Sequence, residues 1–421
     1  MHEAAAVSAL AVTLSLALRR PVLRFGLRIR VGPGIAAGLG VLILVVAGDL
    51  RAGDLTGALA VLWRPLLALA SIMVLTGVAA RVGLFRQLAG LVLPHAGAGA
   101  PRLFGLVFAL SLATAAVFNN DAAILVLTPV VVVLVRELYP DTPYLLLPFA
   151  FAVFMAAGVA PFLTSNPMNT VMAGAAGIDF NSYASRMVPV ATVAAAVTYL
   201  VLRWVFATEL RSAPPAVPAS PGTGWTGAQR SALALVLAVL VGYPAAALAG
   251  LHVYVVAGAG AVLALALAWR HRVGRPVEVL RSAVAWEIIV FLLGMFVLAK
   301  GLQNVGVVER LRELYEAGGG TAVVGVTSAA GSALINNHSM ALANLLAIQH
   351  LPGAGEKTYL AALVGGDLGP RVLPIGSLAG LLWLTLLGRL GVELRLRQFV
   401  VVGTLVTVPS LAASLGVLAL L

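Results

Sequence analysis

Residues 365–377 read Gly-Gly-Asp-Leu-Gly-Pro-Arg-Val-Leu-Pro-Ile-Gly-Ser and interrupt two long apolar stretches. Four glycines and two prolines among these thirteen residues disfavour a regular helix, because proline lacks a backbone donor and glycine leaves the backbone unrestrained. The first half has a counterpart, Thr-Ser-Asn-Pro-Met-Asn at 164–169. We predict unwound backbone facing a cavity at 164–169 and 366–377. The alternatives are an ordinary turn in the first segment and simple pairing of Asp367 with Arg371 in the second.

Another pair of polar clusters lies upstream of these segments. Phe118-Asn119-Asn120-Asp121 precedes the short apolar stretch 122–135, and Asn336-Asn337-His338-Ser339 leads into 338–350. Neither stretch reaches the roughly 20 residues of a comfortable span, so we expect re-entrant or broken helices. Asp121 fits a cap for a helix that begins at Ala122, either alone or combined with proton or substrate handling. His338 is either a capping and packing residue or a proton carrier.

The composition around these clusters is that of a membrane protein. Of the 421 residues, 61% are hydrophobic and 10% are charged, and the mean hydropathy is +1.02, which excludes an ordinary soluble domain. The apolar runs are continuous rather than alternating, which favours helices over a barrel. We therefore predict an all-α, polytopic membrane fold. Helices are expected near 4–18, 34–48, 59–80, 103–118, 144–162, 187–206, 231–249, 252–269, 284–302, 320–335, 372–388 and 399–420.

Charge and cysteine content narrow the function. The net charge of +11 comes from short loops beside apolar segments, where membrane orientation and anionic lipid explain it better than nucleic acid does. The chain has no cysteine, so disulfides and thiolate metal sites are excluded, and we expect no metal and no cofactor. It also has no GxxxxGK[ST] segment, so we expect a transporter without its own ATPase motif, driven by an ion gradient or a separate subunit.

Loop charges predict the orientation, because Lys and Arg concentrate on the cytoplasmic side. On this rule both termini are periplasmic, and the second half is inverted relative to the first. The loops assigned to the cytoplasm are 19–30, 81–102, 203–230 and 270–281. The loops assigned to the periplasm are 49–54, 250–252 and 309–316.

The two halves also resemble each other in sequence. A shift of 223 positions pairs Trp63 with Trp286 and Gly83 with Gly306. Inverted repeats with interrupted helices at matching places are typical of secondary transporters, which bind substrate at the repeat interface. We assign 1–208 to a first repeat, 209–230 to a Pro-rich cytoplasmic linker and 231–421 to a second repeat.

At these clusters the chain resembles the arsenite-antimonite efflux permease (ArsB) family of the ion transporter superfamily, over nearly its whole length. Two departures from the family pattern adjoin the clusters: Asn119 replaces a residue that is often small, and His338-Ser339-Met340 replaces the usual Met-Pro-Thr. The matching stretches include Asn120-Asp121, Leu127-Thr128-Pro129, Ser165-Asn166 with Asn169, Tyr183-Ala184-Ser185, Asn336-Asn337, Asp367-Leu368-Gly369-Pro370 and Pro374-Ile375-Gly376-Ser377.

The resemblance implies a prokaryotic inner-membrane transporter that exports arsenite or antimonite hydroxides in exchange for protons, alone or with a soluble arsenite-stimulated ATPase subunit. Without cysteine, the chain must recognise the hydroxyls of neutral As(OH)3 through oxygen and nitrogen groups, which gives weak, reversible binding. The candidate substrate ligands are Asn119, Asn120, Ser165, Asn166, Asn169, Asn336, Asn337, Gly376 and Ser377. The candidate proton-coupling residues are Asp121, Asp367 and His338, with Asp121 ranked first because Arg371 lies one turn from Asp367.

Three other functions are consistent with a hydrophobic chain of this kind. A sodium- or proton-coupled carrier of carboxylates or other anions could use the Asn and Ser clusters as cation ligands. An intramembrane hydrolase could combine Ser165 or Ser339 with His338, but no G-x-S-x-G pattern is present. A purely structural scaffold leaves the paired polar interruptions unexplained.

The orientation is testable at the C-terminus. A reporter that distinguishes periplasm from cytoplasm, fused after Leu421, should report the periplasm, because the basic loops hold the opposite ends of the helices in the cytoplasm. A cytoplasmic signal from this fusion would reverse the assignment of every loop.

Overall fold

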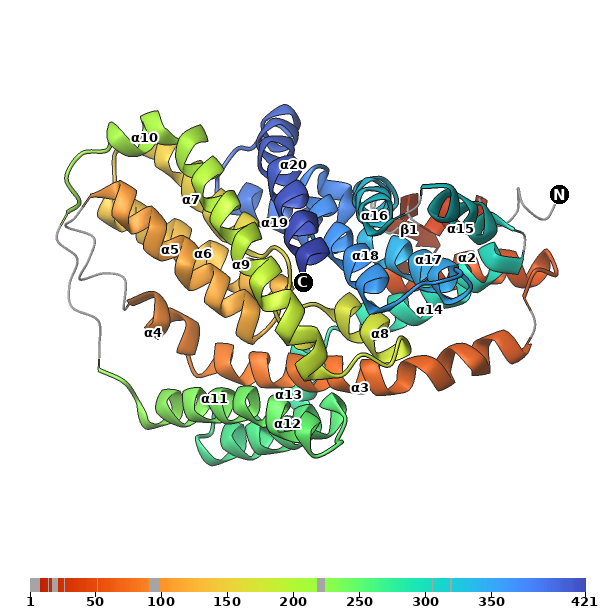
Figure 1. The fold of residues 1–421 in the computed structure, drawn as a ribbon. Helices are drawn as coiled ribbons and strands as arrows, with labels where there is room; N and C mark the ends of the chain where they lie inside the picture. Colours follow the sequence, from red (N-terminus) through yellow and green to blue (C-terminus); the bar gives the residue numbers. More distant parts are fainter. Residues whose placement is uncertain are drawn as a thin grey trace.

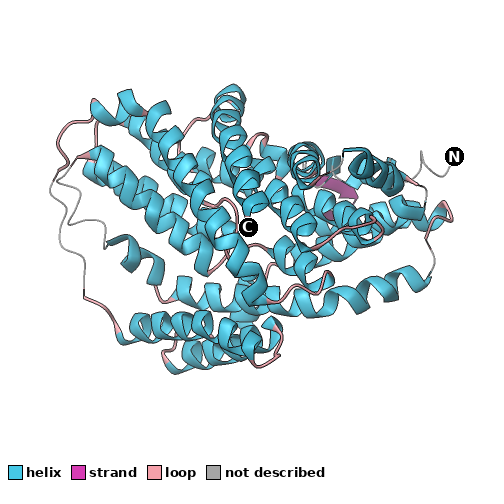
Figure 2. Cartoon of the chain, viewed as in Figure 1, coloured by secondary structure: helices cyan, strands magenta, loops and turns pink. Residues whose placement is uncertain are grey.

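The computed structural model describes residues 8–13, 15–16, 22–25, 27–50, 52–90, 99–217, 224–304, 306–318 and 320–421. Apart from one two-stranded hairpin, the regular structure of this part of the chain is helical (Figure 2). The hairpin, β1 (Val22–Phe25) with β2 (Leu27–Arg30), lies in the predicted loop 19–30. The all-α prediction is therefore confirmed, with one local addition.

Helices of the first half follow the predicted apolar segments. They are α2 (Pro33–Val46), α3 (Ala52–Arg81), α4 (Leu84–Gly90), α5 (Ala100–Val117), α6 (Asn120–Leu138), η2 (Pro143–Leu145), α7 (Leu146–Ala156), η3 (Leu163–Ser165), α8 (Pro167–Ala175), α9 (Phe180–Val205) and α10 (Ala207–Arg211). Of the predicted helix at 4–18, residues 8–13 and 15–16 are described and helical.

The second half contributes a comparable set. It consists of α11 (Gly227–Leu248), α12 (Val253–Arg270), α13 (Pro276–Ala283), α14 (Trp286–Asn304), α15 (Val307–Gly318), α16 (Thr321–Ile335), α17 (Asn337–Gln349), α18 (Glu356–Leu368), η4 (Gly369–Arg371), η5 (Pro374–Gly376), α19 (Leu378–Arg389) and α20 (Leu396–Leu420). The predicted linker 209–230 is shorter than expected, because α10 continues to Arg211 and α11 starts at Gly227.

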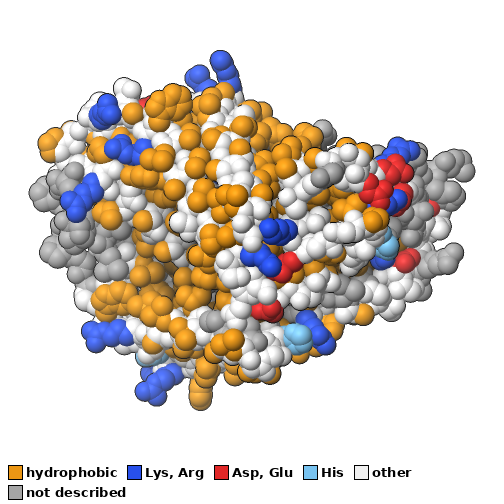
Figure 3. Space-filling view, viewed as in Figure 1, with side chains coloured by type: hydrophobic (Ala, Val, Ile, Leu, Met, Phe, Trp, Pro, Cys, Tyr) orange, Lys and Arg blue, Asp and Glu red, His pale blue; other side chains and the backbone are white. Residues whose placement is uncertain are grey.

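Five helical segments of the described chain are long and apolar enough to cross a membrane: Leu62–Arg81 of α3, and α5, α9, α12 and α20; the bent pair α13 and α14 would make a sixth. Large apolar side chains on their outer faces are exposed, for example Leu200, Trp204 and Val262. Apolar side chains cover most of the face in Figure 3, and Lys and Arg gather mainly toward its edges. A surface of this kind is suited to lipid.

Two helix pairs fold back on themselves where the sequence predicted re-entrant elements. α5 and α6 meet at Phe118 and Asn119, and α16 and α17 meet at Asn336. α6 begins at Asn120, not at Ala122, and it continues through Pro129 without a break. Asp121 therefore lies inside the first turn rather than at the cap position, and its side chain lies outside the described residues.

Two further segments are broken, but the predicted unwound stretches 164–169 and 366–377 are only partly non-helical, because residues 167–169 belong to α8 and residues 366–368 to α18. α7 ends at Ala156 rather than near 162, and the chain stays irregular or 3-10 helical until Asn166. Pro167 starts α8 instead of interrupting a helix, because the missing amide of proline costs nothing at the first position. In the second half α18 runs to Leu368, so the break covers 369–377.

The two halves pack through matching elements. α3 of the first half packs along α12 of the second half, and α2 of the first half packs along α14 of the second half (Figure 1). α5 packs on α7 just as α16 packs on α18, and α9 packs against α20. The broken segments of both halves lie between these paired helices, with η3 against α5, α8 against α17 and α18, and η4 and η5 against α16.

Small residues allow the closest of these contacts, between α16 and α18. A Cβ at Gly365 would collide with the carbonyl oxygen of Gly325 and lie 2.8 Å from the backbone nitrogen of Ala329. Gly369 meets the carbonyl of Ala329 in the same way. Close backbone approach through glycine is a common way for helices to associate in membranes, and here it fixes Asp367 on α18.

Gly365→Ala should therefore destabilise the protein by about 1–3 kcal/mol, because the two helix backbones must separate. A thermal melt in detergent should show a melting temperature several degrees lower. Gly416→Ala is the matched control, because a Cβ there meets nothing within 4 Å. Equal melting temperatures for the two variants would contradict the packing argument.

Candidate functional site

The centre of the candidate site is the carboxylate of Asp367, at the end of α18. Its side chain is buried, with a relative exposure of 7%. Oδ1 accepts a hydrogen bond from Asn166 Nδ2 at 2.5 Å, and Oδ2 accepts from the backbone nitrogen of Ala160 at 2.9 Å and from Asn169 Nδ2 at 3.1 Å. All three donors are neutral and come from the break of the first half and the first turn of α8. The carboxylate thus joins the two halves of the chain.

The start of α8 is built to face this carboxylate. Asn166 is extended, and its Oδ1 accepts from the backbone nitrogen of Met168 at 3.1 Å, which caps the helix. Asn169 lies in the first turn. A helix N-terminus carries a partial positive charge. The N-terminus of α8 therefore stabilises the negative charge of Asp367, as the three hydrogen bonds also do.

Tyr183 of α9 supports the same cluster, and the sequence analysis gave it no role. Its hydroxyl donates to the carbonyl of Ala160 at 2.9 Å and accepts from Asn169 Nδ2 at 2.5 Å. The only sequence signal was its position in the stretch Tyr183-Ala184-Ser185. Two buried acceptors near the break, Asn169 Oδ1 and Thr164 Oγ1, have no hydrogen-bond partner among the described residues.

Arg371 does not form an ion pair with Asp367, so the simple pairing considered from the sequence is wrong. Its guanidinium donates to the carbonyl of Met155 and, at 3.1 Å, to Thr198 Oγ1. Gly158 leaves the room for it, because a Cβ there would collide with Arg371 Nη2. Among the described residues no Lys or Arg nitrogen lies within 4.0 Å of the Asp367 carboxylate.

The remaining candidates tie each hairpin tip to the neighbouring break. In the first half Asn120 Nδ2 donates to the carbonyl of Gly158 at 3.1 Å, and Ser165 Oγ donates to the carbonyl of Ala116 at 2.7 Å. Asn119 is buried beside them. Asn120 and Ser165 therefore link the α5–α6 tip to the break.

The second half uses equivalent contacts. Asn336 adopts φ +80° and accepts from the backbone nitrogen of His338 at 3.0 Å, which starts α17. Asn336 Nδ2 lies 3.5 Å from the carbonyl of Ile375. Ser377 caps α19 by accepting from the backbone nitrogen of Gly380 at 3.0 Å. Gly376 has no room for a side chain, since a Cβ there would lie 2.6 Å from the Cα of Pro370.

His338 is buried beside Phe291 of α14, with ring centroids 6.0 Å apart. Its Nδ1 lies 2.7 Å from Asn337 Oδ1, and its Nε2 has no partner among the described residues. Because Nδ1 faces an amide oxygen, it must carry the proton in the neutral ring. Nε2 is then a buried acceptor.

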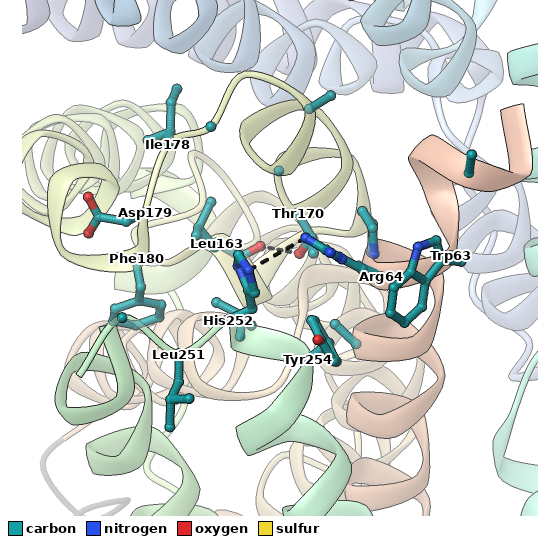
Figure 4. A pocket seen from close by; sticks show the side chains of 18 of the residues that line it. Trp63, Arg64, Leu163, Thr170, Ile178, Asp179, Phe180, Leu251, His252 and Tyr254 are labelled. Atoms are coloured by element: carbon teal, nitrogen blue, oxygen red, sulfur yellow. Dashed lines mark hydrogen bonds between the residues drawn. The ribbon is translucent and has the colours of Figure 1, made fainter. Parts of the chain in front are cut away.

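A pocket of about 630 Å³ is lined in part by Thr170, Gly174 and Ala175 of α8 (Figure 4). Arg64 of α3 is held there by His252 Nε2 at 3.5 Å, by Trp63 and by Tyr254, with its guanidinium carbon 5.2 Å and 6.0 Å from the two ring centroids. The pocket reaches the first break at Leu163 and Thr170. In the sequence this pocket is indicated only by Arg64, the one charged residue within the predicted helix 59–80.

Asp179 at the rim of this pocket points away from Arg64 (Figure 4). Burial raises the pKa of its carboxyl, but hydrogen bonds from Ser182 and Asn181 outweigh burial, and the net pKa lies below the ordinary value. Asp179 therefore caps α9 as a charged group and does not neutralise Arg64.

Comparison with known proteins places this chain in a family. The chain is 31% identical over 412 residues to the arsenical pump membrane protein of Escherichia coli (strain K12). The alignment covers 92% of this chain and 94% of that protein. It is 31% identical over 432 residues to the arsenical pump membrane protein of Yersinia enterocolitica, covering 97% and 96%.

Among solved structures, the YdaH transporter of Alcanivorax borkumensis, described as having an unusual topology, shares the fold with a TM-score of 0.59. That likeness covers 100% of this chain and 97% of that one at 17% identity. The family model for ArsB, described as arsenical pump membrane protein, matches residues 10–421. With a match over nearly its whole length, this chain belongs to the ArsB family of membrane transporters.

Proposed function

We propose that this protein is a secondary transporter that exports arsenite or antimonite hydroxides from a prokaryotic cell in exchange for protons across the inner membrane. Its family and its curated relatives, which are named arsenical pump membrane proteins, support the substrate class. The observation that carries the coupling is the Asp367 carboxylate, buried between the halves and held by neutral donors alone. Because no Lys or Arg nitrogen among the described residues lies within 4.0 Å of this carboxyl, its protonation breaks no ion pair.

The chemistry of the site suits a neutral hydroxide. The chain has no cysteine, so arsenic(III) cannot be trapped by thiolates, and recognition falls to the hydroxyls of As(OH)3. Asn, Ser and Thr side chains at the two breaks and hairpin tips are groups that exchange hydrogen bonds with hydroxyls. Weak hydrogen bonding allows release, which an exporter requires.

The paired contacts of the halves support inverted repeats, with the substrate between the breaks near the membrane midplane. On the loop-charge orientation, the pocket around Arg64 and the loop 250–252 faces the periplasm. α8 lines this pocket through Thr170 and bonds Asp367 through Asn169. This pocket is then the exit side for the hydroxide and the entry side for protons. Asp367 replaces Asp121 as the leading proton carrier, because Arg371 is occupied by Met155 and Thr198.

A sodium- or proton-coupled carrier of carboxylates is the second candidate in the same superfamily. Arg64, a cation without a carboxylate partner within 4.0 Å among the described ion pairs, would suit an anion. Asp367 favours the first proposal, because a buried negative charge repels an anionic substrate. A soluble ATPase subunit that docks on the cytoplasmic loops is compatible with both candidate functions.

Asp367→Asn should reduce gradient-driven arsenite accumulation in everted vesicles to background, at least about tenfold, because the amide keeps the shape and deletes the exchangeable proton. Asp141→Asn, in the exposed turn before η2, is the matched control and should accumulate arsenite as the parent protein does. Parental rates in Asp367→Asn would show that the coupling group lies elsewhere, with His338 next to be tested.

The gradient itself can be tested on the parent protein. Collapsing the proton gradient with an uncoupler should stop arsenite accumulation in everted vesicles, whereas replacing Na+ by K+ should leave it unchanged. Dependence on Na+, or accumulation of a dicarboxylate instead of arsenite, would favour the second candidate.

A further inference from the structure

Two asparagines bind Asp367, and only one of them is free to rotate. Asn166 donates to Asp367 Oδ1 from Nδ2 and accepts from the Met168 amide at Oδ1. Turning its carboxamide by half a turn would remove the cap of α8 and direct an oxygen at the carboxylate. Asn166 is therefore locked in one orientation by the helix that it starts.

Asn169 has no such lock. Its Nδ2 donates to Asp367 Oδ2 and to the Tyr183 hydroxyl, while its Oδ1 is buried without a partner among the described residues. The side chain has a relative exposure of 0%. A buried carbonyl oxygen without a donor is unfavourable and marks a place where a ligand can bind. A hydroxyl of the substrate is such a donor.

We propose that rotation of the Asn169 carboxamide couples the proton on Asp367 to the substrate. This inference rests on the proposed exchange of a hydroxide for a proton. While Asp367 is charged, Nδ2 must face it, and Oδ1 is available to accept an O–H of the substrate. The substrate-binding orientation is thus the one that the charged carboxylate selects.

Protonation of Asp367 reverses this preference. A proton on Oδ2 makes an O–H donor that faces the N–H group of Asn169, so two donors oppose each other. The carboxamide rotates, and Oδ1 accepts from the protonated carboxyl. The substrate hydroxyl then faces an N–H donor, and the O–H that it donated to Oδ1 loses its acceptor. The hydroxyl can accept from this N–H only by giving up that donated bond, so binding is weaker. The proton and the hydroxide therefore weaken each other's binding through one side chain, although they never occupy the same place.

Tyr183 biases the switch toward the charged state. In the structure its hydroxyl both accepts from Asn169 Nδ2 and donates to the carbonyl of Ala160. After rotation the hydroxyl must donate to Asn169 Oδ1 instead, and it releases Ala160. One hydrogen bond is lost, so Tyr183 favours the orientation that binds substrate.

The test is equilibrium binding of arsenite to the purified full-length protein in lipid nanodiscs at a series of pH values. In the parent protein, affinity should fall about tenfold per pH unit below the midpoint, because one proton competes with one substrate. Asn169→Leu should bind arsenite more weakly and without pH dependence. Asn344→Leu is the matched control, since Asn344 also pairs with a tyrosine, Tyr315, but contacts Ser328 instead of a carboxylate.

Two Tyr→Phe variants test the same rotation of the Asn169 carboxamide without removing the group that binds the substrate. Tyr183→Phe should move the midpoint of the pH dependence upward, by up to about one pH unit for one hydrogen bond. Tyr315→Phe should leave the midpoint unchanged. If Asn169→Leu binds too weakly to measure, the midpoint of Tyr183→Phe decides alone.

The outcomes separate this inference from the proposed function. If Asn169→Leu keeps the tenfold dependence, or Tyr183→Phe keeps the parental midpoint, the switch is wrong while exchange through Asp367 stands. If Asp367→Asn itself keeps the pH dependence, or the parent protein binds no arsenite at any pH, the proposed function fails first.

Discussion

The requirement to satisfy a buried carboxylate organises the middle of this protein. An ion in a low-dielectric interior is tolerated only when its hydrogen bonds are made, and Asp367 obtains them from Ala160, Asn166 and Asn169. Within a continuous helix the backbone amides bond to the carbonyls of the same helix. The chain leaves the helical conformation before Ala160, which frees the Ala160 amide for Asp367, and α8 begins after its cap residue Asn166. The break of the first half therefore follows from a charge carried by the second.

The rest of the architecture holds this arrangement in place. Gly365 of α18 and Gly369 of η4 bring this segment close to α16. Each hairpin tip is bound to the break beside it through an asparagine, Asn120 or Asn336. The same kinds of contact occur in both halves. Arg371, which looks like a partner for Asp367 in the sequence, instead ties the second break to α7 and α9. That leaves the carboxylate without an ion-pair partner within 4.0 Å among the described residues.

Much of the fold could be predicted from the sequence because apolar length and polar interruption are local properties. Most of the long apolar runs became helices, and all four polar clusters became helix ends. The errors concern positions that tertiary contacts decide. Pro167 starts a helix rather than breaking one, α6 continues through Pro129, and the first break begins at Ala157 because Asp367 needs the amide of Ala160.

The sequence by itself determined that the chain is helical, that it suits a membrane, and that its polar chemistry lies in four clusters without a thiolate. Those conclusions follow from composition and spacing. Only the tertiary structure decided which clusters meet. It placed Asn166 and Asn169 on Asp367 about 200 residues away, recruited Tyr183, and turned Arg371 elsewhere. Distances between residues so far apart are set by helix packing, which no local pattern records.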